Sequence, residues 1–369
     1  MSEVQNDSAT DRRFMQLALS LGRRGLGNAW PNPAVGAVVV KDGVIIGRGW
    51  TQPGGRPHAE TEALKRAGRA ARGGTLYVTL EPCSHHGQTP PCAESIIRAG
   101  ISRVVTAIED PNPAVAGQGS ALLRERGIAV ETGVCAEEAA RSHAGHIRRM
   151  RDGRPYVFLK LAVSADGKAG AAGRRPVAIT GEEARAKVHL MRARADALLV
   201  GIGTVLADDP ALNCRLPGMA EHSPVRVVLD ARLRVPLASG VVATAREFKT
   251  WIFAAQDASA MGEEILRAKG LEVLRVDAQD GKLDLHQVLK VLADRGITRL
   301  MVEGGPTVAA SFVSADLVDE LAVFRSPANL GAEGIDALEG MPLSALTQAH
   351  RLIASETAGV DRIEHYERA

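Results

Sequence analysis

One histidine, one glutamate and two cysteines in the first third of the chain have the residue types and order of a catalytic zinc site. His58, Cys83 and Cys92 provide one imidazole and two thiolates, three ligands for a tetrahedral zinc whose fourth position is left for water. Zinc lowers the pKa of that water toward neutrality. Glu60, two residues after the histidine, is then expected to carry protons, as the corresponding glutamate does in zinc-dependent base deaminases.

The sequence around these residues distinguishes the pattern from a chance occurrence. A histidine followed two residues later by glutamate is common and alone indicates little. Here both cysteines follow a proline, Pro82 or Pro91, close to predicted helix starts, where backbone amides would help to hold thiolates deprotonated. Eight residues separate Cys83 from Cys92, more than in the short Pro-Cys-x-x-Cys signature of the simplest deaminases.

Alternating helix and strand patterns must position these residues, and they indicate the α/β class. In the first half we expect helices over 11–22, 59–71, 93–99 and 120–126, and strands over 35–40, 44–48, 75–80, 103–108 and 128–131. A helical run over 136–149 then leads to Gly153 and Pro155, which break helices. We therefore predict two α/β domains, 1–150 and 151–369.

The second half carries a phosphate-binding pattern at the end of one predicted strand. Gly201-Ile202-Gly203 begins like a dinucleotide fingerprint, but Leu206 stands where its third glycine belongs. The segment 303–307, Glu-Gly-Gly-Pro-Thr, fits better, because its glycines allow close backbone approach and its proline would start a helix whose amides hold a phosphate. An ordinary strand-to-helix turn is the alternative interpretation.

Composition excludes several classes of protein. The 369 residues include 45 Lys+Arg against 43 Asp+Glu, a net charge of +2, and only 3% aromatic residues, which argues against a dedicated nucleic-acid binder. No apolar run approaches the roughly 20 residues that span a bilayer. The first residues are polar and lack a secretory pattern, so we expect a cytoplasmic protein acting on a small molecule, with no nucleic-acid or membrane partner. Four cysteines are too few for a disulfide framework.

The motifs of the first half resemble the deaminase domain of the bacterial bifunctional riboflavin-biosynthesis deaminase/reductase family. The resemblance rests on 57–60 and 81–92, together with 31–33, 35–36 and 110–113. It implies a cytidine-deaminase-like α/β/α fold, one Zn²⁺ per chain, and hydrolytic loss of the 2-amino group, as ammonia, from a diamino-hydroxy-pyrimidine that carries a phosphoribosylamino group. It also implies that Asn32 binds substrate. For His85, His86 and Thr89, contact with the base or phosphate and a solvated loop remain equal alternatives.

The second half is similar to the reductase domain of the same family, through Lys160, 164–167, 200–210 and 303–307. The similarity implies a dihydrofolate-reductase-like α/β fold, opening of the ribose, hydride transfer from NADPH that makes a ribityl chain, and a homo-oligomer. The cofactor contacts that it implies are Ala162, Thr204, Asp208, Gly305, Pro306, Thr307, Val308, Ala309, Ala310 and Ser311. The substrate contacts that it implies are Arg192, Leu212, Arg215 and Glu303, with a solvated helix face as the alternative for Arg192 and core packing for Leu212.

One stretch departs from the family pattern. Many members carry Ser-x-Trp before Ile-Thr, where this chain has Pro176, Val177 and Ala178. A hydroxyl for the phosphate and an aromatic face near the cofactor are both missing. We hypothesise that Arg174 and Arg175 hold the phosphate instead.

Two other functions remain as alternatives. One is a nucleoside or RNA-base zinc deaminase whose second half only binds, which NADPH binding would exclude. The other is a non-catalytic zinc-stabilised scaffold, against which Glu60 argues because a structural site needs no proton carrier. The remaining cysteines and several histidines show no metal-site spacing and are interpreted as incidental: Cys135, Cys214, His143, His146, His189, His222 and His286.

Overall fold

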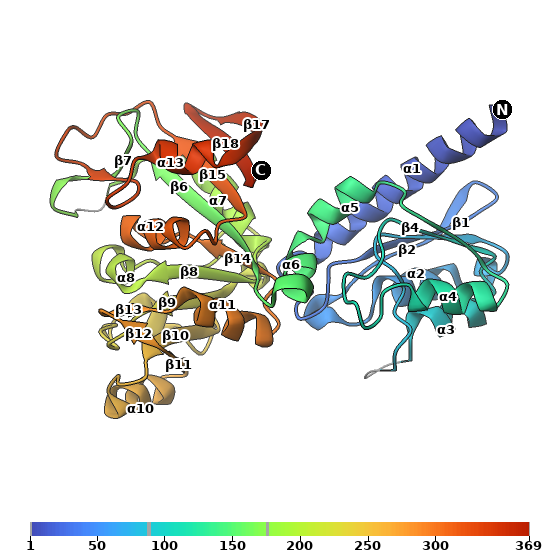
Figure 1. The fold of residues 1–369 in the computed structure, drawn as a ribbon, viewed down its shortest axis with the longest axis horizontal. Helices are drawn as coiled ribbons and strands as arrows, with labels where there is room; N and C mark the ends of the chain where they lie inside the picture. The colour runs from blue at the N-terminus through green and yellow to red at the C-terminus, as the bar shows by residue number, and fades with distance from the viewer. Residues whose placement is uncertain (1, 87–89, 175–176, 369) are drawn as a thin grey trace. The chain divides into compact units, whose positions relative to one another are not determined.

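The computed structural model describes residues 2–86, 90–174 and 177–368 (Figure 1). The chain forms two compact units that divide between Arg154 and Pro155, each with its own sheet. The predicted boundary at residues 150 and 151 falls inside helix α6, Ala144–Asp152, which continues until Gly153 adopts a left-handed conformation at φ 64°. No helix within the described residues is long and apolar enough to cross a membrane.

The first unit is built on a five-stranded sheet in the order β2-β1-β3-β4-β5. The first two strands form an antiparallel hairpin around Asp42 and Gly43, both with positive φ, and β3, β4 and β5 run parallel. The strands are β1 (Gly36–Lys41), β2 (Val44–Trp50), β3 (Thr75–Val78), β4 (Arg103–Thr106) and β5 (Ala129–Thr132). The parallel strands place their carboxyl ends at one edge, where chemistry-bearing loops gather.

Helices cover both faces of this sheet. In β1, Ala37 and Val39 pack with the apolar residues of the α2 and α3 side, while Val38 and Val40 pack against α1. The helices are α1 (Ser2–Gly22), α2 (Ala59–Ala67), α3 (Cys92–Ala99), α4 (Gln118–Glu125), α5 (Ala136–Ser142) and α6. The predicted helix over 136–149 is interrupted at His143, between α5 and α6. The unit is thus a three-layer α/β/α sandwich, the arrangement that the sequence analysis expected.

The second unit has a nine-stranded sheet in the order β11-β10-β9-β8-β14-β6-β15-β18-β17. The first seven strands in this order are parallel and the last two form an antiparallel hairpin. The sheet strands are β6 (Tyr156–Val163), β8 (Ala197–Gly201), β9 (Val225–Leu229), β10 (Thr250–Ala255), β11 (Glu272–Val276), β14 (Arg299–Val302), β15 (Glu320–Arg325), β17 (His350–Ala358) and β18 (Asp361–Arg368). Two short pairs lie outside it, β7 (Lys168–Gly170) with β16 (Ile335–Asp336), and β12 (Ala278–Gln279) with β13 (Lys282–Leu283).

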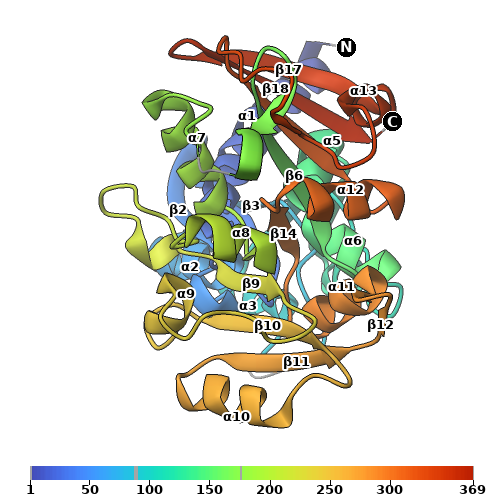
Figure 2. The ribbon, with the colours of Figure 1, turned by 90° about the vertical axis from the view of Figure 1, so that its left-hand side faces the viewer.

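Apolar residues of α7 to α10 pack against one face of the large sheet, and α11 and α12 lie on the other side of it (Figure 2). The helices are α7 (Glu182–Ala193), α8 (Ile202–Asp208), α9 (Gly240–Ala243), α10 (Ala260–Ala268), α11 (Leu285–Asp294), α12 (Pro306–Ser314) and α13 (Leu343–Gln348). The predicted α/β architecture of this unit is confirmed.

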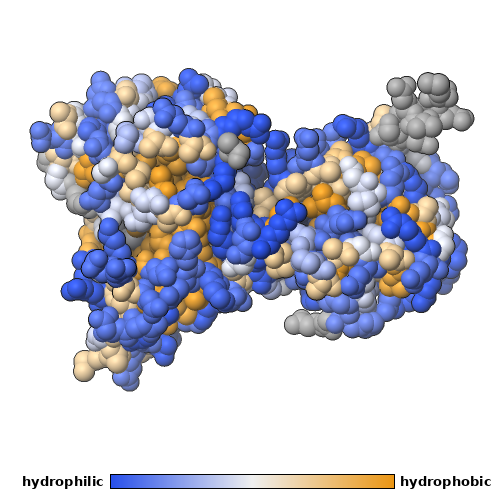
Figure 3. Space-filling model, viewed as in Figure 1, coloured by the Kyte–Doolittle hydropathy of each residue, from blue (hydrophilic) through white to orange (hydrophobic). Residues whose placement is uncertain are grey.

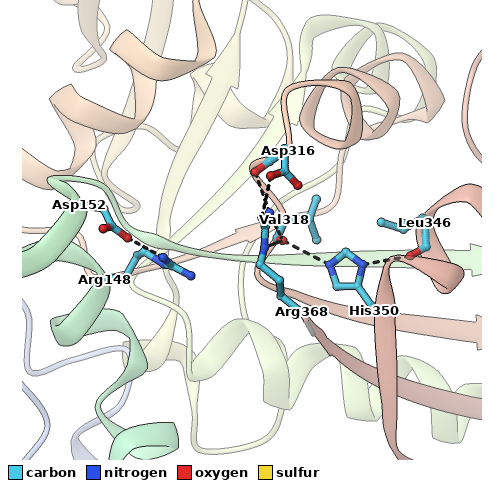
Figure 4. A network of polar contacts seen from close by, with 7 residues as sticks. All are labelled: Arg148, Asp152, Asp316, Val318, Leu346, His350 and Arg368. Carbon is cyan, nitrogen blue, oxygen red and sulfur yellow. Dashed lines mark hydrogen bonds and ion pairs between the residues drawn. The ribbon is translucent and has the colours of Figure 1, made fainter.

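The β17–β18 hairpin is an element that the sequence analysis did not predict. Its ends are fastened by polar contacts (Figure 4): Arg368 donates to the backbone oxygens of Val318 and Asp316 at 2.8 and 2.7 Å. The ring nitrogens of buried His350 lie 3.0 Å from Leu346 O and 3.3 Å from Val318 O. The hairpin thus extends the parallel sheet with two antiparallel strands.

Candidate active and cofactor-binding sites

Three short segments of the first unit bring the predicted zinc ligands together. His58 is the N-cap residue of α2 and Cys92 is the first residue of α3, so helix starts fix both backbones. Cys83 lies in the segment that follows β3. Glu60 is in the first turn of α2, beside the N-cap histidine.

The distances between the ligand atoms fit one tetrahedral zinc. His58 Nδ1 lies 3.3 Å from Cys92 Sγ and 3.8 Å from Cys83 Sγ, and one ligand atom from each residue lies within 4.8 Å of the others. Zinc bonds of about 2.1 Å to nitrogen and 2.3 Å to sulfur would separate such atoms by about 3.5 to 3.8 Å. The donor set of one imidazole and two thiols matches that of the zinc-dependent base deaminases.

The two cysteines are electrostatically different. The Cys83 sulfur accepts a hydrogen bond from the Cys92 thiol and, at 3.3 Å, from the Cys92 backbone amide at the start of α3, and these bonds together with His58 lower the pKa of Cys83 to about 4. The hydrogen bond to Cys83 and burial raise the pKa of Cys92. The Cys83 sulfur is thus a thiolate at neutral pH and a helix amide helps to hold it, whereas the sequence analysis expected this of both cysteines.

Glu60 lies against the ligand group but is not one of the three ligands. Its side chain is buried, and burial raises the pKa of its carboxyl, an effect that the nearby His58 partly offsets. A carboxyl whose pKa is moved toward neutrality can both accept and release a proton. This is the behaviour expected of the predicted proton carrier.

Asn32 lies next to the histidine. Its side-chain nitrogen donates to Gly55 O at 2.8 Å and lies 3.3 Å from His58 Nε2, the ring nitrogen that does not face the sulfurs. Gly55 has φ 85°, and an added Cβ there would come within 2.9 Å of Asn32, so the glycine makes this approach possible. When Nδ1 binds a metal, Nε2 carries the ring hydrogen, so this amide nitrogen is a neighbour of His58 and not the acceptor that orients a metal-binding imidazole. The predicted contact between Asn32 and substrate stays a prediction.

Two residues to which the sequence analysis gave no function, Glu81 and His146, contact the loop after β4. Buried Glu81 accepts hydrogen bonds from the backbone amides of Asp110, Gly117 and Ser120 at 3.1, 2.9 and 2.9 Å, which ties this loop to the segment that carries Cys83. His146, interpreted as incidental from its spacing, lies 3.6 Å from the Asp110 carboxylate. His146 and Asp110 are far apart in the sequence, so the tertiary fold brings them together and no sequence motif predicts the contact.

The loop between the cysteines is partly described. Burial alone would raise the pKa of Asp110, but His146, with a smaller contribution from His85, helps to outweigh burial, and the pKa is lowered. Exposed His86 lies 3.3 Å from Glu94. Thr89 lies outside the described residues. A role for these three in binding substrate stays a prediction.

In the second unit, a cavity of about 1030 Å³ lies at the carboxyl ends of β8, β9 and β14. Figure 3 shows apolar surface gathered over the part of this unit that carries α8 and α12. Gly305 N donates to Thr204 Oγ1 at 3.2 Å, which joins the start of α12 to α8. Seven predicted cofactor contacts line the cavity: Thr204, Asp208, Gly305, Pro306, Thr307, Val308 and Ser311.

The other three predicted cofactor contacts do not line this cavity. Ala309 and Ala310 are buried on α12, and Ala162 packs against the core from β6. Val177 and Ala178 do line it, so the departure from the family pattern falls at the cavity wall. Arg175 and Pro176 lie outside the described residues, and the phosphate role hypothesised for Arg174 and Arg175 stays a hypothesis.

The four predicted substrate contacts lie around a buried ion pair rather than along the cavity wall. Arg192 Nε and Nη2 each donate to the Glu303 carboxylate at 2.7 Å, and Arg192 Nη1 donates to Asn213 O at 3.2 Å. Burial alone would raise the pKa of Glu303, but the Arg192 guanidinium outweighs it and lowers that pKa. Burial lowers the pKa of the neighbouring Lys160.

Leu212 and Arg215 lie on either side of Asn213, the residue whose backbone oxygen Arg192 contacts. The side chain of Leu212 is 2% exposed and packs in the hydrophobic core, although its backbone has φ 52°. For the side chain of Leu212, the structure therefore supports core packing, the alternative interpretation. Arg215 Nη1 donates to Asn213 Oδ1 at 3.2 Å. Arg192 does not lie on a solvated helix face, the alternative considered for it, because its side chain is 13% exposed and paired with Glu303.

A three-layer unit with a His-Cys-Cys site and a buried glutamate, joined to a parallel-sheet unit with a large cavity, defines a zinc-binding deaminase linked to a reductase. Comparison with known proteins gives the same division. Residues 8–108 match the cytidine and deoxycytidylate deaminase zinc-binding region, and residues 155–361 match the RibD C-terminal domain.

Full-length relatives match both units. The chain is 43% identical to riboflavin biosynthesis protein RibD of Bacillus amyloliquefaciens, over 91% of this chain and 92% of that protein, and 42% identical to RibD of Escherichia coli, over 90% and 92%. Among solved structures, Acinetobacter baumannii RibD superposes with a TM-score of 0.87 at 36% identity, covering 98% of this chain and 99% of that one. The chain belongs to the RibD family of bifunctional riboflavin-biosynthesis deaminase/reductases.

A Thermotoga maritima structure supplies the full name of the two activities. It is a diaminohydroxyphosphoribosylaminopyrimidine deaminase/5-amino-6-(5-phosphoribosylamino)uracil reductase, with a TM-score of 0.85 at 34% identity, covering 98% of this chain and 100% of that chain. The family, the fold and the bifunctional character predicted from the sequence are thereby confirmed.

Proposed function

We propose that the first unit removes the 2-amino group of diaminohydroxyphosphoribosylaminopyrimidine by hydrolysis and that the second unit reduces the ribosyl group of the product with NADPH. The observation that carries the first half is the buried Glu60 carboxyl beside the group His58, Cys83 and Cys92. The homo-oligomer and the cytoplasmic location expected from the sequence belong to the same proposal.

In the first unit, His58, Cys83 and Cys92 would hold the zinc. Zinc, when bound, supplies a water molecule whose pKa lies near neutrality. Glu60 would accept a proton from that water and pass it to the ring nitrogen of the pyrimidine. It would then carry a second proton, from the hydroxyl that has added to the ring carbon, to the departing amine, which leaves as ammonia while the ring carbonyl forms. The raised pKa of Glu60 supports this role, because the same carboxyl must accept a proton and then release it. Asn32, whose side chain lies beside His58, would contact the substrate.

In the second unit, residues at the start of α12 would bind the diphosphate of the cofactor. The helix begins with Pro306, which has no amide hydrogen, and Gly305 N donates to Thr204 Oγ1. The amides left for a phosphate are those of Thr307 and Val308, both of which line the cavity. Asp208, whose pKa burial raises, lines the same cavity and would orient the sugar. NADPH supplies the hydride, so the protein mainly aligns the nicotinamide with the sugar carbon. Arg192 and Glu303 would contact the substrate.

A coupled assay tests both halves of the proposal. Purified zinc-loaded protein is given the phosphoribosylamino-pyrimidine, and ammonia release and NADPH oxidation are followed together. We expect both, with NADPH consumed only after deamination. Ammonia release without NADPH oxidation would refute the reductase assignment and leave the deaminase assignment standing.

A matched pair of variants tests Glu60. Glu60→Gln is expected to abolish ammonia release while zinc content stays at one per chain, because Glu60 is not a ligand. Glu62→Gln is the control: this glutamate, on the same helix, pairs with exposed Arg66 at 3.4 Å. Loss of zinc in Glu60→Gln, or normal turnover by it, contradicts the assigned role.

A further inference from the structure

The segment 209–215, between α8 and β9, carries two of the predicted substrate contacts and has an unusual backbone. Leu212 and Arg215 belong to it, and between them the backbone oxygen of Asn213 accepts a hydrogen bond from Arg192 at 3.2 Å. Asp209 and Leu212 both have positive φ, 39° and 52°. Residues other than glycine seldom adopt this left-handed conformation, so neighbouring structure must hold the segment in place.

A fully buried arginine on β9 contacts this segment and has no assigned role. The side chain of Arg226 is 0% exposed, and its Nη1 donates to Ala211 O at 3.3 Å. Because a guanidinium has five N–H groups in one plane, a single side chain can bind several segments at once. The other acceptors lie along the stretch from α9 to β10: Thr244 Oγ1 at 2.8 Å, Val241 O at 3.0 Å, Phe248 O at 3.0 Å and Thr250 Oγ1 at 2.6 Å.

The charge of Arg226 is balanced by neutral oxygens. Within the part of the chain that the structure describes, no carboxylate forms an ion pair with it. Burial lowers the pKa of Arg226 to about 10, with Glu247 acting the other way, so the side chain is still charged at neutral pH. Burying a charge is costly, and an apolar side chain would fill the space without that cost. What only the arginine provides is a simultaneous hold on three backbone oxygens, one of which is Ala211 O.

A second contact fastens the beginning of the same segment. The amide of Gly240, the first residue of α9, donates to Asp209 Oδ1 at 2.8 Å. Arg226 also binds α9, so the segment is anchored at Asp209 and at Ala211 to one supporting structure. The residues that follow these anchors lie against α7, which carries Arg192. The anchors therefore determine where the rest of the segment lies relative to the buried ion pair.

We propose that Arg226 and Asp209 are positioning residues for the reductase reaction. By fixing the backbone of the segment 209–215, they set where Arg215 and the pair of Arg192 with Glu303 meet the substrate. This inference rests on the proposed reductase function of the second unit. Both residues act through the segment, so binding of the deaminated pyrimidine should depend on them, whereas binding of NADPH at the start of α12 should not.

Two single variants of the full-length protein test the anchors in steady-state reduction of the already deaminated substrate. Arg226→Lys keeps the positive charge, but its three donors sit on one atom and cannot span three segments. Asp209→Gly removes the carboxylate that binds Gly240 N, while glycine adopts φ 39° freely and still ends α8. In each variant we expect KM for the pyrimidine to rise at least about 10-fold and kcat to change less, because small displacements of a binding group can cost about 100-fold. The NADPH dissociation constant and ammonia release should be unchanged.

Arg275→Lys is the matched control. Arg275, on β11, likewise donates to three backbone oxygens, those of Ala255, Gln256 and Ala258, but it does not contact the segment 209–215. We expect this variant to have a lower melting temperature and an unchanged KM. In the double variant Arg226→Lys/Asp209→Gly, the rise in KM should be smaller than the product of the two single rises, because both changes release one segment.

The other outcomes overturn the inference. Asp209 is exposed, so Asp209→Gly should fold normally, and an unchanged KM in it would refute the anchoring role even if Arg226→Lys folds poorly. A rise in KM of equal size in Arg275→Lys would show that KM follows stability in general. An equal loss of NADPH affinity would show that the anchors do not act on substrate binding selectively. Failure of the wild type to oxidise NADPH with the deaminated substrate would refute the proposed reductase function itself, which the wild type alone decides.

Discussion

The ligand group of the first unit and the cavity of the second are suited to their proposed cofactors in opposite ways. His58, Cys83 and Cys92 concentrate all of the affinity for a metal in three side-chain atoms within 4.8 Å of one another. The cavity, at about 1030 Å³, spreads its contacts over the ends of three strands and uses backbone amides, small residues and a few charges. A substitution in the first site removes a whole bond, whereas one in the second removes a fraction of many contacts.

The electrostatics differ in the same sense. In the ligand group a thiolate is held by one helix amide and one imidazole, and each group depends on its neighbour. Next to the cavity, Glu303 and Arg192 neutralise each other directly, while the cations that line the cavity, Arg232, Arg234 and Lys282, take no part in that pair. We therefore expect all-or-none effects in the first unit and graded effects in the second.

The largest effect is expected from Cys83→Ser. This change removes a zinc ligand, so zinc content and ammonia release should both fall, the latter by more than the roughly 100-fold typical of changes outside the ligand shell. Reduction of the already deaminated substrate should be unaffected. Metal analysis and the two separate assays check this, with Cys135→Ser, a partly buried cysteine outside the ligand group, as control. Retention of one zinc per chain with normal turnover would remove Cys83 from the site.

The buried pair of the second unit gives the next largest effect. Arg192→Met leaves the Glu303 carboxylate buried without its guanidinium, which should lower the free energy of unfolding by about 3 to 5 kcal/mol. The control is Arg267→Met, which removes the exposed partner of Glu263 and should cost no more than about 1 kcal/mol. Urea unfolding measures both variants. Equal losses would mean that burial does not set the strength of the pair.

The sequence was sufficient to predict the zinc site because each ligand lies beside a local signal. A proline precedes each cysteine, although of the two only Cys92 lies at a helix start, and the glutamate lies two residues from the histidine. The alternating strands and helices of both units also follow from local patterns, with errors mainly at element ends and at His143, where the run of helix formers hides a break.

What the sequence did not predict depends on residues far apart in the chain. Glu81 meets amides 29 to 39 residues away, and nothing near it in sequence indicates them. The cations that line the cavity come from the turn after β9, with Arg232 and Arg234, and from β13, with Lys282, segments far apart in the sequence that the tertiary fold brings to one cavity. The β17–β18 hairpin is exposed along much of β17, so its apolar alternation is weak.

A pH-dependent effect separates the units further. Burial lowers the pKa of His143 to about 3, against 6.5 for the unperturbed group, with its ring 3.0 Å from Thr79 Oγ1. Between these values the unfolded chain binds a proton that the folded chain does not, so the first unit should lose stability as pH falls below about 6.5, by up to about 1.4 kcal/mol per pH unit. His143→Gln should flatten that slope. Unfolding of both proteins at pH 7 and pH 5 measures it, and parallel slopes would contradict the assignment.

The smallest effect is expected at the cavity wall. Thr204→Val removes the hydroxyl that accepts from Gly305 N at 3.2 Å, so the start of α12 loses one positioning contact, and a hydrogen bond of this kind contributes about 1 kcal/mol. NADPH should bind about 5-fold more weakly, with zinc content and ammonia release unchanged. Thr357→Val on exposed β17 is the matched control in the titration. A loss of 100-fold or more would show that the second site, like the first, depends on single atoms, and the contrast between the two units would fail.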